Sequence, residues 1–272
     1  MKSSHSYRNR RHIIAGCIAG VLLVIFSATS IWANRAFKAT ASVSVKKTKR
    51  SNTKAPDKPK PVSTPAPTVA TTPPPAPTSI KHTSIVTTVF WAGEPSSSDN
   101  SYIANSQSAW DGNWQEHYGG IDSGTARNGY LPAGFTPSEN PFYFALPYSD
   151  FTESGIRKST ANNCPNYAAR ASLVNYSWCK NSWIAISYGG KTAYAQWEDV
   201  GPYETDDVNY VFGNGLPINK IDARAGLDVS PAVRDYLGLS GIDKTDWQFV
   251  PAASVPAGPW KNIITTTKGD AN

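Results

Sequence analysis

The feature that most constrains this chain is an uncharged apolar run over residues 13–33. In a helix that rises 1.5 Å per residue, these 21 residues span roughly 30 Å, which is the thickness of a bilayer's hydrocarbon core. A buried helix of a soluble domain keeps a polar face, whereas this run is apolar or small on every face. We therefore expect one transmembrane helix or signal anchor.

Basic residues lie on both sides of this run, so the positive-inside rule does not set its orientation. The short tail of residues 1–12 and the composition of the segment after the run favour a C-terminal domain outside the cytoplasm. We expect a single-pass protein of the cell membrane. Whether the anchor is cleaved stays open at this point.

Residues 34–82 are first basic and then rich in Pro and Thr, with nine prolines between Pro56 and Pro77. Proline favours the extended polyproline II conformation, so this segment is expected to be a disordered linker of some stiffness. Residues 51–82 would reach about 100 Å at ~3.1 Å per residue. Such a stalk suits a domain that works on a layer held away from the membrane.

The chain has a net charge of +6, but its N-terminal and C-terminal parts carry net charges of opposite sign. Residues 1–82 contain 14 Lys and Arg and one acidic residue. Residues 83–272 contain 12 Lys and Arg and 19 acidic residues. A nucleic-acid-binding domain needs a basic folded face, and here the folded part is acidic. We therefore expect no nucleic-acid partner.

The remaining chain, residues 83–267, predicts one domain that is mainly β with short helices and long loop inserts. Two strand-like runs around Gly189-Gly190 indicate a hairpin with a primed turn. Residues 230–238 have the pattern of a helix that begins after Ser230, has Pro231 in its first turn and ends before Gly238. Strands are expected over residues 85–91, 142–148, 182–188, 191–197 and 247–250.

The domain contains two cysteines, Cys164 and Cys179, which are 15 positions apart. Outside the cytoplasm such a pair indicates a disulfide bond, which would contribute on the order of 3 kcal/mol. The two histidines of the domain region, His82 and His117, do not lie near the cysteines in the sequence. We therefore expect no metal site and no cofactor.

Two short motifs resemble known proteins. One is Ala195-Gln-Trp-Glu-Asp-Val-Gly-Pro202, and the other is Gly226-Leu-Asp-Val-Ser-Pro-Ala-Val233. Together they resemble the double-psi β-barrel of rare lipoprotein A-like, barwin and expansin domains, and the 3D domain of a membrane-bound lytic transglycosylase. The resemblance covers roughly residues 142–250 and implies a six-stranded double-psi β-barrel. Residues 95–140 and 151–180 are then inserts.

The resemblance implies glycan chemistry on a cell wall. Asp199 stands where these transglycosylases carry the Asp that acts as general acid and then as base. Asp228 matches one of the two catalytic Asp residues of the similar family 45 endoglucanases, although Gly226-Leu227 replaces the usual His-Phe. Glycoside cleavage needs a proton for a poor leaving group, and a carboxylic acid supplies it when burial or a second carboxylate raises its pKa.

Further residues are candidates for substrate contact. Glu198 and Tyr203 flank Asp199 in the motif, and Trp110 and Trp114 lie in a polar segment where an exposed ring would stack on a sugar face. Strand alternation places Glu198 and Asp199 on opposite faces, so only one of them faces a groove. The other tryptophans of the strands are expected in the core, namely Trp183, Trp197 and Trp247.

Two alternatives to an enzyme remain. One is a barrel that, like an expansin, binds glycan without hydrolysing it, because an Asp before Gly-Pro also serves to cap a turn. The other is a surface scaffold for a protein partner. The sequence does not determine the oligomeric state.

Overall fold

The computed structural model describes residues 80–269. The predicted transmembrane helix and almost all of the predicted linker lie outside the described residues. Within residues 80–269, no helix combines the length and the apolar character that crossing a membrane requires.

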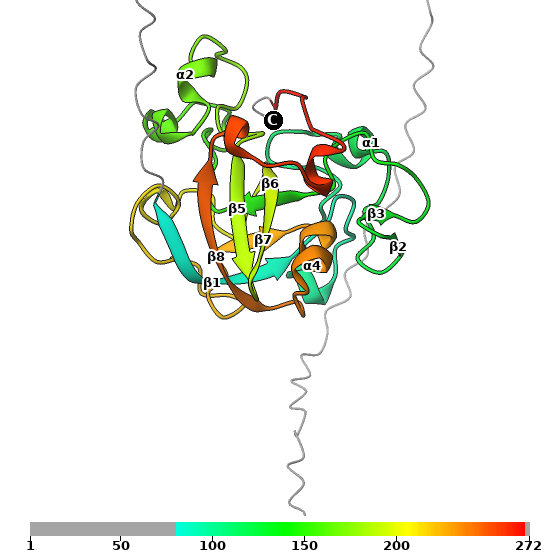
Figure 1. The fold of residues 1–272 in the computed structure, drawn as a ribbon. Helices are drawn as coiled ribbons and strands as arrows, with labels where there is room; N and C mark the ends of the chain where they lie inside the picture. Colours follow the sequence, from blue (N-terminus) through cyan, green and yellow to red (C-terminus); the bar gives the residue numbers. More distant parts are fainter. Residues whose placement is uncertain (1–79, 270–272) are drawn as a thin grey trace, which may run out of the picture. The chain divides into compact units, whose positions relative to one another are not determined.

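The domain is mainly β and is built on a closed six-stranded barrel (Figure 1). The strands follow one another around the barrel in the order β1-β7-β4-β6-β5-β8. Two neighbouring pairs, β1 with β7 and β4 with β6, are parallel, and the other pairs are antiparallel. This mixed topology is consistent with the predicted double-psi barrel. The barrel strands are β1 (Lys81–Val89), β4 (Tyr143–Leu146), β5 (Trp183–Tyr188), β6 (Lys191–Val200), β7 (Leu227–Val229) and β8 (Asp243–Val250).

The predicted hairpin is confirmed. Tyr188 of β5 pairs with Lys191 of β6 across a two-residue turn. Gly189 and Gly190 both have positive φ, at 55° and 79°, which is the conformation that a type I′ turn requires and that glycine adopts without a steric penalty.

The predicted helix is also confirmed, as α4 (Pro231–Leu237). The hydroxyl of Ser230 accepts a hydrogen bond from Val233 N, and Gly238 ends the helix in the left-handed conformation. The other short elements are η1 (Ser98–Asn100), α1 (Trp114–Tyr118), β2 (Arg127–Asn128), β3 (Leu131–Pro132), η2 (Ser159–Asn163), α2 (Tyr167–Arg170), α3 (Val208–Val211), η3 (Ala252–Ser254) and η4 (Pro259–Lys261).

Strand β4 is buried on both faces. Phe144 and Leu146 belong to the main core, while Tyr143 and Ala145 belong to a second cluster that contains Phe90 and aromatic residues of α1. A strand buried on both sides is apolar throughout rather than alternating, as the sequence Tyr-Phe-Ala-Leu is. The expected core tryptophans are confirmed, because Trp183, Trp197 and Trp247 are at most 5% exposed.

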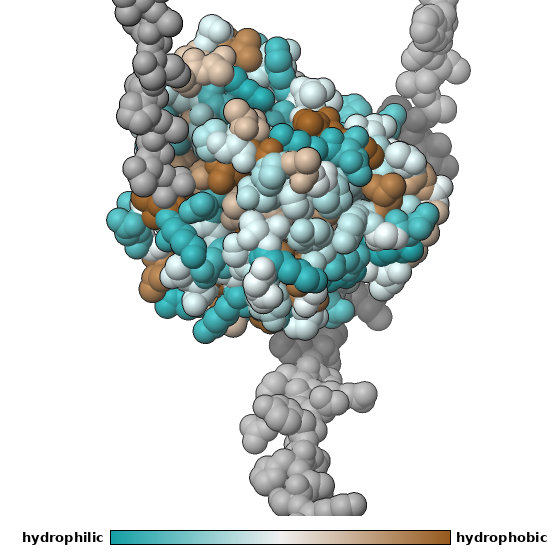
Figure 2. Space-filling view, in the orientation of Figure 1, coloured by the Kyte–Doolittle hydropathy of each residue, from teal (hydrophilic) through white to brown (hydrophobic). Residues whose placement is uncertain are grey.

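The two inserts attach to different parts of the barrel. Figure 1 shows α1, β2 and β3 of the first insert together on one side, and α2 of the second insert on another. The second insert is held by the predicted disulfide bond between Cys164 and Cys179, which is confirmed. On the face seen in Figure 2, hydrophobic residues form small separate patches among hydrophilic ones.

The Ser230 hydroxyl joins α4 to the barrel. It accepts from Val233 N at the start of α4 and from Tyr143 N at the start of β4, both at 3.3 Å. We expect Ser230→Ala to lower the free energy of unfolding by about 1–2 kcal/mol, because it leaves two backbone donors short of an acceptor. Urea unfolding measures this loss. The matched change at the exposed Ser254 should cost much less, and equal losses would contradict the role of Ser230.

Candidate functional site

Four adjacent strands bring one row of side chains to the same face of the barrel wall. Thr88 of β1 pairs with Asp228 of β7, Asp228 pairs with Ala145 of β4, and Ala145 pairs with Asp199 of β6. Directly paired residues share a face of a sheet. The two acids therefore lie on one face with the small Ala145 between them, and their Cα atoms are about 10 Å apart, which is two strand spacings.

A β-bulge in β6 creates this row. Phe144 pairs with Trp197, but the next residue of β4, Ala145, pairs with Asp199, so that Glu198 is the extra residue. Phe144 and Ala145 alternate between the two faces, which places Trp197 in the core and turns Asp199 to the face of Ala145. Without the bulge, Trp197 and Asp199 would point the same way.

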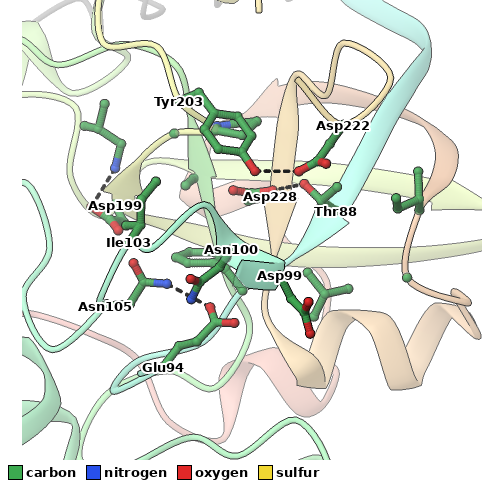
Figure 3. Close-up of a pocket in the computed structure, with 18 residues that line it drawn as sticks. Thr88, Glu94, Asp99, Asn100, Ile103, Asn105, Asp199, Tyr203, Asp222 and Asp228 are labelled. Carbon is green, nitrogen blue, oxygen red and sulfur yellow. Dashed lines mark hydrogen bonds between the residues drawn. The ribbon is translucent and has the colours of Figure 1, made fainter. Parts of the chain in front are cut away.

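Asp199 and Asp228 both line a pocket of about 330 Å³ (Figure 3). Its walls come from the end of β1, from the first insert, from the turn after β6 and from the loops around residues 222 and 241. The residues that line it are Thr88, Val89, Phe90, Glu94, Asp99, Asn100, Ile103, Asn105, Ala145, Asp199, Val200, Gly201, Pro202, Tyr203, Asp222, Asp228, Gly241 and Ile242.

Asp199 is almost completely buried, with 8% of its surface exposed. Its Oδ1 accepts hydrogen bonds of 2.8 Å from Ala109 N, in the first insert, and from Val200 N. Burial raises the pKa of Asp199 to about 6, although these two N–H groups act in the opposite direction. The insert thus supplies part of the environment of this carboxyl group.

Asp228 is half-buried and accepts a hydrogen bond from the Thr88 hydroxyl. Burial raises its pKa to about 7; the Thr88 hydrogen bond opposes this shift, whereas the charges of Asp199 and Glu94 add to it. Asp199 is therefore close enough for its charge to disfavour the ionised form of Asp228.

Two hydrogen-bonded pairs complete the polar lining. Asn105 Nδ2 donates to Glu94 Oε2 at 2.9 Å, and burial raises the pKa of Glu94. Tyr203 donates to Asp222 Oδ2 at 2.5 Å, and Figure 3 shows this pair beside Asp228. Tyr203 therefore lines the pocket that contains the two acids, and its contact with substrate stays a prediction.

Glu198, a predicted substrate contact, does not line this pocket. It is 1% exposed and forms an ion pair with Lys180, which is also buried. The prediction of substrate contact by Glu198 is therefore wrong in this structure, because a carboxylate enclosed with its own cation is not presented to a ligand.

Trp110 and Trp114 do not form a sugar-stacking surface either. Both are 0% exposed, and neither lines the pocket. Trp110 packs edge-to-face against Trp197 in the main core, and Trp114 packs against Tyr143 in the second cluster. The polar sequence around them misled the prediction, because the insert folds back on the barrel and buries its aromatic side chains there.

Sequence reasoning missed Glu94 and the part of the first insert that walls the pocket, including Asn105. It also missed Thr88 and Asp222, which hydrogen-bond to Asp228 and Tyr203. Glu94 lies three residues after the end of the first predicted strand, and a polar residue close to a strand end was the available signal for it. The local sequence around Thr88, Asn105 and Asp222 gave no indication that they line the pocket.

Among residues 80–269, no group of three or more His, Cys, Asp or Glu side chains is arranged to hold a metal ion. No protein-family model matches the chain, and a search of curated proteins finds no match. The chemistry of the site is therefore argued from its geometry.

The raised pKa of Asp228 predicts a pH-dependent effect on stability. A folded-state pKa of about 7, against an ordinary 3.8, means that the folded domain binds this proton more tightly than the unfolded chain does. The resulting stabilisation is complete below the ordinary pKa and is lost as the pH rises through about 7. Asp228→Asn removes this ionisation, so its effect on the free energy of unfolding should be more favourable at pH 8 than at pH 4, by about 3–4 kcal/mol for a shift of about three pKa units.

Urea unfolding of both proteins at the two pH values measures this difference. Asp99→Asn is the matched control, since it removes an exposed carboxyl group from the same pocket. If Asp228→Asn has the same effect at pH 4 and pH 8, the carboxyl group does not titrate as described.

Proposed function

We propose that the domain is a double-psi β-barrel that binds and cleaves cell-wall glycan, with Asp199 as the general acid/base and Asp228 as its partner. The observation that carries this proposal is the pair of acids on one face of one pocket, with pKa values raised to about 6 and about 7. Acid/base catalysis works best with groups that titrate near the working pH, and ordinary Asp residues do not.

The charge of the pocket supports the same chemistry. Its lining contains five carboxyl side chains and no Lys, Arg or His: Glu94, Asp99, Asp199, Asp222 and Asp228. Glycoside cleavage passes through a transition state with oxocarbenium character, and fixed negative charge around it lowers its energy. At neutral pH such a lining would also repel an anionic substrate.

The spacing of the two acids is compatible with more than one type of glycoside cleavage. Their Cα atoms lie about 10 Å apart across Ala145. Side chains on one face at this spacing can hold their carboxyl groups about 6.5–9.5 Å apart, as in inverting hydrolysis, or about 5 Å apart, as in enzymes that form a glycosyl intermediate. Transglycosylation by Asp199 alone needs no water and fits the same pocket.

The proposed setting is the outside of the cell membrane, with the domain on its stalk and glycan and membrane as partners. The disulfide bond between Cys164 and Cys179 supports this setting, because such bonds persist in oxidising compartments.

A non-catalytic glycan-binding module is the second candidate, and one observation favours it. Asp199 Oδ1 accepts two backbone hydrogen bonds, from Ala109 N and Val200 N, as a carboxylate that fixes a turn would. In that case the pocket holds a sugar through Tyr203 and the acids without transferring a proton.

Release of soluble fragments from purified cell-wall sacculi by the full-length protein tests the proposal. We expect Asp199→Asn to reduce release at least about 100-fold, which is the usual size of a general acid/base contribution, while thermal unfolding stays cooperative. The control Glu153→Gln, at an exposed position outside the pocket, should release fragments at the wild-type rate. The mass of the products then separates hydrolysis, which adds water, from transglycosylation, which does not.

Wild-type release by Asp199→Asn would overturn the catalytic role. The binding module predicts no release by any variant, together with sedimentation of the wild-type protein with sacculi that weakens in Tyr203→Ala and persists in Asp199→Asn.

A further inference from the structure

A second cluster of ionisable groups lies apart from the pocket. The ammonium group of Lys180 contacts Glu198 Oε2, and the two side chains are 0% and 1% exposed. A third buried group, Glu139, is 3% exposed and close enough for its negative charge to raise the pKa of both partners. The cluster thus joins one amine and two carboxyl groups out of contact with solvent.

The carboxyl groups of this cluster are incompletely paired. Glu198 Oε1 and Glu139 Oε2 are buried without a hydrogen-bond partner in the structure. Burying these oxygens without hydrogen-bond partners costs free energy. Burying the two charges of the ion pair also costs desolvation free energy, which their mutual attraction offsets only in part. A net charge of −1 over the three groups would add to this cost.

The backbone holds the amine and its partner carboxyl in place. Lys180 follows Cys179 of the disulfide, and its carbonyl oxygen accepts from Asn166 Nδ2 and Arg170 Nη1 at 3.1 and 2.9 Å. Glu198 occupies the extra position of the β6 bulge. Groups fixed in contact in this way react with a much higher effective concentration than free groups in solution.

The C-terminal segment covers the cluster. Thr267 donates to Glu139 Oε1 at 2.7 Å, and its carbonyl oxygen accepts from Asn181 Nδ2 at 2.9 Å. A Cβ atom placed on Gly269 would lie 2.4 Å from Trp110 Cβ and 2.5 Å from Lys180 Cδ, so the chain passes directly over the stem of the lysine. Figure 1 shows this segment, coloured red, crossing one end of the barrel. Water is thereby kept from the cluster.

We propose that Lys180 and Glu198 are joined by an intramolecular amide bond, formed in the folded domain with Glu139 as the proton carrier. Lys180 Nζ attacks the carboxyl carbon of Glu198, the new N–C bond forms, and the C–OH bond of the acid breaks. One water molecule leaves, and no oxidant or co-reactant is needed. The amide replaces two buried charges by neutral groups.

Glu139 is needed because the amine must first lose a proton. Burial lowers the pKa of Lys180, but the charges of Glu198 and Glu139 outweigh burial and hold this pKa above its ordinary value. Burial raises the pKa of Glu198 to about 7 despite its contact with Lys180, so its protonated form is accessible. Transfer of the ammonium proton to a carboxylate inside the cluster gives a neutral amine beside a neutral acid, which is the reactive pair.

Mass spectrometry of the denatured full-length protein tests this proposal. Beyond the two hydrogen atoms lost in the disulfide, we expect a mass deficit of one water, and proteolysis should yield a branched peptide that contains Lys180 and Glu198. In Glu139→Gln and in Lys180→Met, we expect the intact mass to show no water deficit. Proteolysis of either variant should give separate, unlinked peptides for positions 180 and 198. Glu116→Gln, a matched change at an exposed position, should keep the deficit.

A wild-type protein that digests to unlinked Lys180 and Glu198 peptides would overturn the proposal, whether or not the variants fold. If the mass deficit persists in Glu139→Gln, the amide bond forms without Glu139, and the proposed role of Glu139 as proton carrier is wrong.

Discussion

The candidate site depends on how β4 pairs with its two neighbours. Ala145 is in register with Asp199 on one side and with Asp228 on the other, and the bulge at Glu198 turns Asp199 to the shared face. A one-residue slip of either pair would move an acid to the opposite face, because side chains alternate along a strand. The side chain between them must also be small, since a larger one would fill the space above Ala145 in which the carboxyl groups meet the pocket.

Strand β4 is buried on both of its faces, and the first insert covers one of them, which makes the insert part of the site. The face that carries Ala145 also carries Tyr143, which is covered by Trp114 and Phe90. Packing of these aromatic side chains brings the insert over the barrel wall, and Ala109 N then reaches Asp199. The same packing that buries apolar surface thus desolvates the acid and sets its pKa, so stability of the insert and chemistry of the site are coupled.

Elements whose cause is local could be predicted from the sequence. The hairpin follows from Gly189-Gly190 between two strand-like runs, and α4 follows from Ser230, Pro231 and Gly238. Strand β7 could not be recognised, because three residues with Asp228 in the middle show no alternation, and only its pairing with β1 and β4 makes it a strand. The motif Asp residues were identified through resemblance, whereas Thr88 and Asp222 reach the site through pairing and loop placement that no local pattern records.

Glu198 and Asp199 show how strongly the surroundings decide the role of a residue. They are adjacent in β6, both are buried, and burial raises the pKa of both above the ordinary value. Glu198 has a cation in contact, Lys180, whereas Asp199 is hydrogen-bonded only by backbone N–H groups and lines an open pocket. An enclosed acid in contact with an amine can react only with that amine, while an acid at a pocket can exchange its proton with a ligand. The position of Lys180, which the second insert and its disulfide determine, therefore leaves Asp199 as the acid of the pair that faces the pocket.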